Sequence, residues 1–472
     1  MADPTPPAGP VRLRILFLVW FGQLASLIGS SLTGFVLGVW VYQRTGSVSQ
    51  FAMIFLASTL PGILAAPFAG VLADRWDRRR LMLASDTGAA LATGLVGLLV
   101  ALDALQVWHI YLTTAAGSAC AVVHQVSYAA LTPGIVGKRH LARFNGLAQA
   151  GRAAQIAAPL LAGALIGLVG VGGVIALDLA TFAIAVATLA AVRLPAGVTR
   201  PDRAGGDSSW RDAGAGWRYL RTRPGMPGLL VVFGAYNFLF ALAGVLVQPL
   251  ILSFSSPATL GGLMFAGGAG LLAGSLLMGA WGGPRRRIHA VYAGLAGGGV
   301  ALSLHSLAPS PWLIAVTAPA FLFTLPIINA ASLTLLQTKV PSAVLGRVMA
   351  TARVIGEAAV PVAYLAAGPL ADGVFEPLLR ADGALAGSAG SIIGTGQGRG
   401  IALIFAVAGL AMLVLTGVAL AQPRIRHIDD LPDAVDLPAA PAARAVPAAR
   451  AGAGGARVRP AESSPPVHEG VA

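Results

Sequence analysis

The chain contains about twelve apolar runs, each long enough to cross a lipid bilayer as a helix. The hydrocarbon core of a bilayer is spanned by about 20 predominantly apolar residues in helical form. A sequence made of such runs predicts an all-α polytopic membrane protein. The runs lie near residues 13–43, 48–72, 81–103, 108–131, 144–168, 171–193, 228–252, 258–281, 288–308, 311–335, 346–371 and 400–422.

The composition excludes several other classes of protein. Apolar residues make up 56% of the chain and charged residues 11%, whereas soluble domains carry about 25% charge. The net charge of +13 is distributed between the apolar runs, so it indicates membrane topology and not a nucleic-acid partner. Cys120 is the only cysteine, so neither a disulfide framework nor a metal cluster is expected. We expect no cofactor.

Basic residues are concentrated in every second loop between the runs. Cytoplasmic loops of membrane proteins carry the excess of Lys and Arg, which predicts that both termini are cytoplasmic. The predicted outer loops hold only Arg44, Arg380 and Arg399. The predicted inner segments hold Arg75, Arg78, Arg79, Arg80, Lys138, Arg139, Arg143, the arginines of 193–223, Arg285, Arg286, Arg287, Lys339 and Arg347.

The runs form two halves of six that look like repeats. Lys138 precedes Arg152 by the same separation as Lys339 precedes Arg353, and these are the only lysines in the chain. Duplicated halves facing each other across a central site are typical of secondary transporters. The predicted organisation is a cytoplasmic N-terminus at 1–12, a bundle at 13–193, a linker with an interfacial amphipathic helix at 194–227, a bundle at 228–422 and a disordered cytoplasmic tail at 423–472.

A charged segment between the second and third runs carries a specific pattern. Residues 70–80 read Gly-Val-Leu-Ala-Asp-Arg-Trp-Asp-Arg-Arg-Arg, which resembles the G-x-L-A-D-R-x-x-R-R signature of the major facilitator superfamily. The resemblance implies that Gly70 permits close helix approach and that Asp74, Arg75, Arg78 and Arg353 form an inner gate. Asp74 is then expected against the amino end of the eleventh span, where the helix dipole is positive.

Further stretches resemble the drug and siderophore exporters of this superfamily. They are residues 20–23, 40–47 and 368–377, while the antiporter motif at 158–163 is degenerate. The resemblance implies a monomeric exporter in the bacterial inner membrane, which moves a small amphipathic molecule (a siderophore, peptide-like product or drug) by proton antiport. An importer of the same fold and a non-transporting membrane sensor remain as alternatives. An enzyme is not expected, because no hydrolase or metal motif occurs in the runs.

Ionisable side chains at bilayer depth are costly, about 2.5–3.5 kcal/mol on insertion scales, and are therefore functional candidates. Proton exchange is assigned to Glu357, Asp178 or His124. The structural alternatives are an ion pair of Glu357 with Arg353, a helix-to-helix bond of Asp178 and a buried, satisfied His124. The polar residues expected to line a substrate cavity are Gln23, Ser26, Ser30, Gln149, Arg152, Gln155, Tyr236, Asn237, Gln248 and Asn329.

Overall fold

The computed structural model describes residues 10–136, 141–191 and 213–433, and all their long elements are helices. Nine of these helices are long and apolar enough to cross a membrane. Large apolar side chains point outward on most of them; Leu168 is 79% exposed and Trp312 is 84% exposed. Such a surface is stable only against lipid, because soluble proteins rarely expose continuous apolar area of this extent.

The first bundle contains six spans in five continuous helical elements. Gly170 has φ 67° and ψ −176°, so it breaks α5 into two arms that run in opposite directions. Glycine is suited to this position because a side chain would be strained at that φ. The elements are α1 (Pro10–Thr45), α2 (Val48–Arg75), α3 (Arg78–Ala101), α4 (Val107–Val136) and α5 (Leu141–Ala191).

The second bundle supplies the other six spans. They are α8 (Met226–Leu252), α9 (Pro257–Trp281), α10 (Arg287–His305), α11 (Pro311–Lys339), α12 (Ser342–Gly368) and α15 (Arg399–Ala421). The short elements are α7 (Ala213–Thr222), the π-helix η3 (Pro369–Phe375), α13 (Glu376–Leu378), α14 (Ala389–Ile393), α16 (Pro423–Arg426) and the 3₁₀ turn η4 (Ile428–Asp430).

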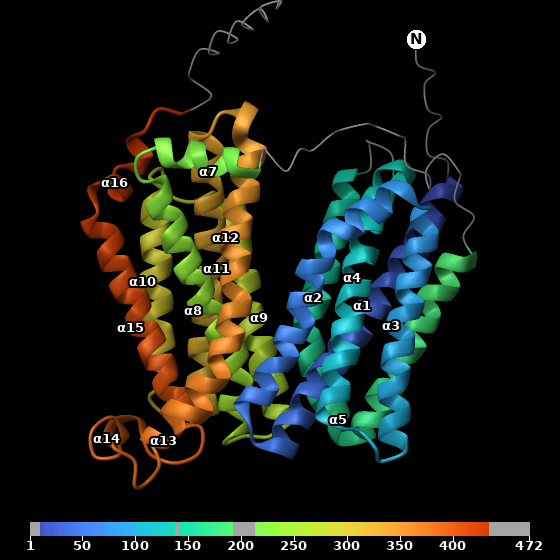
Figure 1. Cartoon of the computed structure of the whole chain (residues 1–472), viewed down its shortest axis with the longest axis horizontal. Coiled ribbons are helices and arrows are strands. Elements are labelled where there is room, and N and C mark those ends of the chain that lie inside the picture. The colour runs from blue at the N-terminus through green and yellow to red at the C-terminus, as the bar shows by residue number, and fades with distance from the viewer. Residues whose placement is uncertain (1–9, 137–140, 192–212, 434–472) are drawn as a thin grey trace, which may run out of the picture.

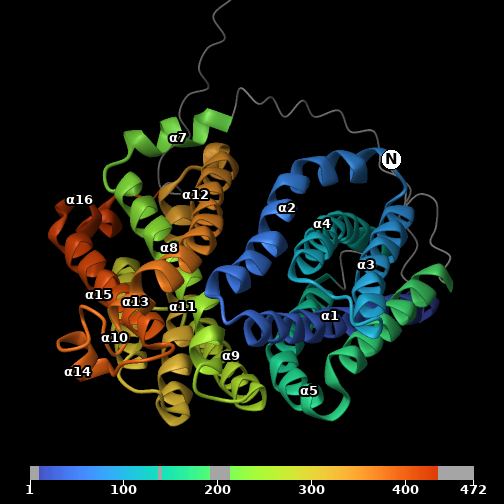
Figure 2. The same ribbon diagram turned by 60° about the horizontal axis from the view of Figure 1, so that its bottom comes forward.

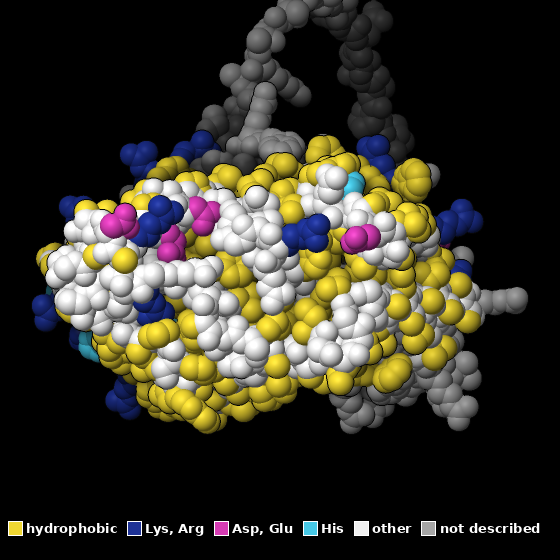
Figure 3. Space-filling view, turned by 90° about the horizontal axis from the view of Figure 1, so that it is seen from below, with side chains coloured by type: hydrophobic (Ala, Val, Ile, Leu, Met, Phe, Trp, Pro, Cys, Tyr) yellow, Lys and Arg dark blue, Asp and Glu magenta, His cyan; other side chains and the backbone are white. Residues whose placement is uncertain are grey.

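The two bundles stand side by side and are in contact at one end (Figure 1). We call the end that carries α7 the linker end and the end that carries α13 and α14 the loop end. Figures 1 and 2 show α2 and α12 close together at the loop end and diverging toward the linker end. Seen from the loop end, apolar side chains cover much of the surface, Asp and Glu side chains lie across the face, and several Lys and Arg side chains project at the outline (Figure 3).

The segment after α15 corrects the prediction of a disordered tail from residue 423. Ile425 is 2% exposed and Ile428 is fully buried, and both belong to the core of the second bundle. The polar composition of this segment suggested disorder, but these two isoleucines give it an apolar face that packs. The remainder of the predicted tail, 434–472, lies outside the described residues, as do residues 194–212 of the predicted linker.

A carboxylate from this segment caps a helix of the second bundle. Asp429 Oδ2 accepts a hydrogen bond from the backbone N–H of Ile288 in the first turn of α10, at 3.0 Å. In the first bundle Asp77, which directly precedes α3, caps that helix by accepting from Arg80 N at 3.0 Å. The second copy of the arginine-rich loop has no aspartate, so the segment after α15 supplies the missing cap.

Candidate functional site

The loop-end contact between the bundles is built around Asp372. Its Oδ2 accepts hydrogen bonds from Ser47 Oγ at 2.9 Å and from the N–H of Ser49 at 2.8 Å. Its Oδ1 accepts from the N–H of Val48 at 3.0 Å. These groups are the amino end of α2, so a carboxylate of the second bundle caps a helix of the first. Unpaired N–H groups and the helix dipole both favour an anion at this position.

Small residues let the bundles approach at a second place on the loop-end side. A Cβ added to Gly163 of α5 would lie 2.7 Å from Pro257 O and 3.2 Å from the Cα of Gly261. The two backbones are therefore in direct contact, as glycine allows at membrane helix crossings. Gly163 is the last residue of the degenerate antiporter motif, which retains this small residue at the point of contact between α5 and α9.

At the linker end, arginines of the 70–80 segment join the first bundle together. Arg78 donates to Ala130 O of α4 at 3.2 Å. Arg79 donates to Leu189 O at 3.1 Å and to Ala190 O at 2.7 Å, at the carboxyl end of α5. Cations at the carboxyl ends of helices satisfy unpaired carbonyls and the negative end of the dipole. These contacts lie within one bundle.

The predicted gate residues on α2 are not engaged with the other bundle in this conformation. Asp74 and Arg75 are exposed, and a Cβ at Gly70 would have open space within 4 Å. The expected close helix approach at Gly70 is therefore absent here, because α2 and α12 diverge at this end. The residue that precedes α12 is Pro341, whose own side chain cannot cap the helix.

The first bundle encloses a cluster of polar groups that the sequence reasoning only partly identified. His124 Nδ1 lies 2.8 Å from Asp86 Oδ1, out of line for a hydrogen bond, so the contact becomes an ion pair when the imidazole is protonated. Gln23 Nε2 donates to Asp86 Oδ2 at 3.2 Å. Asp86 is 6% exposed. It was not among the predicted residues, although its position five residues into a span was a signal that could have identified it.

Asp178 is the second buried carboxylate of this bundle and is 1% exposed. Its Oδ1 accepts long hydrogen bonds, 3.4 Å each, from Ser30 Oγ and Thr181 Oγ1. Its Oδ2 has no partner among the described residues. The structure thus places two predicted residues, Asp178 and Ser30, in contact across α1 and α5.

Glu357 lies in a different environment, on α12. Its Oε1 accepts from Arg353 Nε at 2.6 Å, with 49% of the Glu357 side chain and 77% of the Arg353 side chain exposed. This is the intrahelical pair that was considered as its structural alternative. Neither side chain is enclosed by neighbouring helices in this conformation.

The other predicted cavity residues are spread over both bundles. Gln248 is 8% exposed and its Oε1 would lie 3.7 Å from a Cβ at Gly38, at the bundle contact. Tyr236 is fully buried, with its hydroxyl unpaired among the described residues. Ser26 is buried, Asn237 donates to Phe233 O at 2.8 Å, and Gln155 and Asn329 are exposed. The side chains of Gln149 and Arg152 lie outside the described residues.

The molecule consists of two six-helix bundles that meet at one end through the Asp372 cap and the close contact at Gly163. The first bundle also contains buried carboxylates. This architecture is that of a polytopic membrane transporter. The sequence profile of the Major Facilitator Superfamily matches residues 19–363. The chain belongs to this family, which agrees with the expectation of a transporter and not an enzyme.

The chain is also similar to curated efflux proteins. The chain is 27% identical over 362 residues to macrolide efflux protein A of Streptococcus pyogenes, covering 75% of this chain and 89% of the relative. It is 24% identical to the multidrug efflux pump Tap of Mycolicibacterium fortuitum, covering 88% and 97%. It is 27% identical to the enterobactin exporter EntS of Citrobacter koseri, covering 70% and 79%.

Solved structures share the fold at lower identity. A bacterial homologue of the lysosomal transporter Spinster, in an inward-facing and unoccupied conformation, has a TM-score of 0.65 at 14% identity, covering 89% of this chain and 98% of that chain. A bacterial homologue of the iron transporter ferroportin, in an inward-facing state, has a TM-score of 0.64 at 17% identity, covering 87% and 99%.

Proposed function

We propose that this chain exports a small amphipathic molecule from the cytoplasm by alternating access driven by proton antiport. The observation that carries the proposal is the cap that Asp372 forms on α2. It holds the loop end together, while Asp74, near the other end of α2, has no partner among the described residues of the second bundle. The similarity to a macrolide efflux protein and to an enterobactin exporter supports outward transport of a drug-like or siderophore-like compound.

The two aspartates occupy equivalent positions in the same pattern. Gly-x-Leu-Ala-Asp occurs at 70–74, near the end of α2, and again at 368–372, just beyond α12. α2 and α12 run in opposite directions, so each has its amino end beside the other's carboxyl end. Asp372 caps α2 in this conformation. We infer that Asp74 caps the amino end of α12 when the linker end closes.

The orientation follows from the distribution of charge. The linker end carries the arginines of residues 75–80 and 285–287, which the positive-inside rule assigns to the cytoplasm. With the loop end outside, the conformation described here is closed to the outside and its bundles diverge toward the cytoplasm. This state is the one that would accept a cytoplasmic substrate.

Proton exchange requires a group that gains and loses a proton within the membrane. Asp86 and His124 form a buried acid–base pair on neighbouring helices, and we assign the exchange to them. Protonation of either partner changes the charge of the pair, and therefore its attraction, in a low-dielectric site. Asp178 and Glu357 are the other carboxylates to be tested.

Export is tested with everted membrane vesicles from cells that do or do not express the chain. Erythromycin and a catecholate siderophore serve as probes, and vesicle uptake corresponds to cellular export. Under an inside-acid gradient, we expect vesicles that contain the chain to take up at least one probe faster than vesicles without it. Vesicles with the Asp372→Asn variant should take up the probe no faster than vesicles without the chain. Faster loss of probe from loaded everted vesicles would favour the importer. Equal metabolite profiles inside and outside the two kinds of cell would contradict transport of a cellular product.

A further inference from the structure

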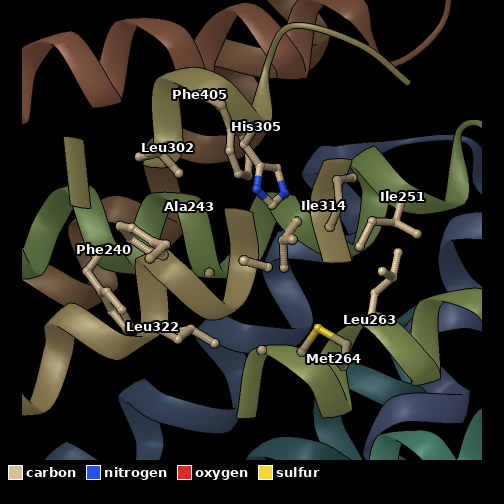
Figure 4. Close-up of a pocket in the computed structure, with 15 residues that line it drawn as sticks. Phe240, Ala243, Ile251, Leu263, Met264, Leu302, His305, Ile314, Leu322 and Phe405 are labelled. Atoms are coloured by element: carbon tan, nitrogen blue, oxygen red, sulfur yellow. The ribbon is translucent and has the colours of Figure 1, made fainter. Parts of the chain in front are cut away.

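A partly open apolar pocket lies among the helices of the second bundle. It has a volume of about 120 Å³ and is lined by α8, α9, α10, α11 and α15. The side chains around it in Figure 4 are apolar with a single exception, His305, whose ring points into the pocket. An engineered cavity of similar size, about 150 Å³, stays dry and binds benzene. This pocket therefore has room for a small aromatic molecule.

The hydrogen bonds of His305 determine what its free nitrogen can do. Nδ1 lies 2.8 Å from Thr317 Oγ1, and Thr317 Oγ1 also donates to Leu313 O at 2.8 Å. When the single hydroxyl proton of Thr317 is on Leu313 O, Nδ1 is the donor to Thr317. In a neutral imidazole the other nitrogen is then an acceptor. His305 is 3% exposed, and its Nε2 has no partner among the described residues.

The walls of the pocket favour a flat, apolar ligand. The ring of Phe405 stacks on His305 at a centroid distance of 5.2 Å, and Phe240 stacks on Phe321 at 5.5 Å. Aromatic rings in such walls favour offset-stacked or edge-on contacts with another ring. A buried acceptor without a partner is costly, so a ligand that donates one hydrogen bond would relieve that cost.

We propose that this pocket binds a one- or two-ring aromatic molecule that carries a single O–H or N–H donor, of the phenol or indole type, with the donor on His305 Nε2. The proposed site lies among α8, α9, α10, α11 and α15 of the second bundle. It also reaches the bundle contact, because Ile251, Leu263 and Ile314 line the pocket and pack in one cluster with Leu32 and Phe35 of α1. A bound ligand would therefore stabilise the conformation in which the loop end is closed.

The test uses ¹⁹F NMR with the purified chain in nanodiscs, with 4-fluorophenol and 4-fluorotoluene as probes. Empty nanodiscs correct for partition into lipid. The two probes are similar in size, but only the phenol donates a hydrogen bond. We expect both to bind and His305→Phe to lower the ratio of phenol affinity to toluene affinity about two- to tenfold, the worth of one hydrogen bond.

A second variant fills the pocket while His305 is retained. Gly244 lines the pocket, and a Cβ there would meet nothing within 4 Å. Gly244→Phe should abolish binding of both probes without unfolding the protein, which the thermal unfolding midpoint checks. Absence of probe binding to the parent chain, binding unchanged in Gly244→Phe, or a phenol-to-toluene ratio unchanged in His305→Phe would each overturn the proposal. Phenol binding should also raise the unfolding midpoint, and a fall would contradict the link to the closed loop end.

Discussion

Asp86, Asp178 and Glu357 have different surroundings within the spans, and these differences bear on the proposed proton exchange. Asp86 is buried beside an imidazole and an amide, Asp178 is buried with one free oxygen, and Glu357 is half exposed beside an arginine. A partner that can itself gain or lose a proton allows the charge of a buried pair to change. The guanidinium beside Glu357 is always charged and cannot exchange a proton itself.

The first prediction concerns proton coupling. Asp86→Asn should retain substrate binding but remove the acceleration of transport by an imposed proton gradient, because the amide cannot titrate. Transport in everted vesicles, with and without the gradient, measures this. Asp178→Asn and Glu357→Gln are tested in parallel. If Asp86→Asn is still accelerated and Glu357→Gln is not, the proton is carried on α12 instead.

The second prediction concerns the caps at the two ends of α2 and α12. Asp372→Asn should shift the population toward closure at the linker end, since a charge-assisted hydrogen bond contributes about 1.5–3 kcal/mol. Asp74→Asn should shift it the opposite way. Spin labels at Phe68 of α2 and Val354 of α12, which are 71% and 67% exposed, report the linker-end separation. The distance between the two labels should shift to shorter values in Asp372→Asn. Identical distance distributions in the two variants would show that the caps do not control the conformation.

Among the elements, α10 depends on a cap that is distant in sequence. Asp429→Ala removes the acceptor for Ile288 N and should lower the free energy of unfolding by about 1 kcal/mol, as loss of a helix cap does. The matched control is Asp430→Ala, because Asp430 is 47% exposed and 3.5 Å from Arg286. An exposed pair of this kind contributes about 0–1 kcal/mol. Thermal unfolding in detergent compares them, and a larger loss in Asp430→Ala would contradict the assignment.

The crossing of α5 and α9 gives a prediction with an internal control. Gly163→Val should abolish transport while the protein still inserts, because a side chain there meets the backbone of Pro257 and Gly261. Gly167→Val, one turn further along α5, should be tolerated, since a Cβ at Gly167 meets nothing within 4 Å. Vesicle transport and the amount of folded protein are measured for both. Equal activity of the two variants would show that close contact at Gly163 is dispensable.

The elements themselves were well predicted from the sequence, whereas their partners were not. Runs of apolar residues report the length of a helix, so the six spans of each half were foreseen, including the two arms on either side of Gly170. The sequence does not report which side chain of one helix meets which of another. Asp86 and His124 are 38 positions apart (124 minus 86) and meet only because α3 packs on α4. Asp429 was assigned to a disordered tail because the segment is polar in composition, and its contact with α10, beside the buried Ile425 and Ile428, could not be read from that composition.

For the whole molecule, the topology can be tested directly. After removal of Cys120, a cysteine at Ser391, in α14 at the loop end, should react with an impermeant thiol reagent applied to intact cells. A cysteine at Ser208, outside the described residues, should react only after lysis. The reverse pattern of labelling would overturn the orientation, and with it the assignment of this conformation to cytoplasmic access.

The repeated Gly-x-Leu-Ala-Asp pattern has a consequence for the energetics of switching. If the same chemical group closes each end in turn, the conformational equilibrium lies near balance, because each cap lost is replaced by a similar one. A two-state equilibrium near 1:1 responds to small differences in binding free energy, and about 1.4 kcal/mol changes the ratio tenfold. A single proton or a weakly held substrate would then be sufficient to reverse the populations. A carrier of this design can turn over compounds that it binds poorly, which suits export of molecules of varied shape.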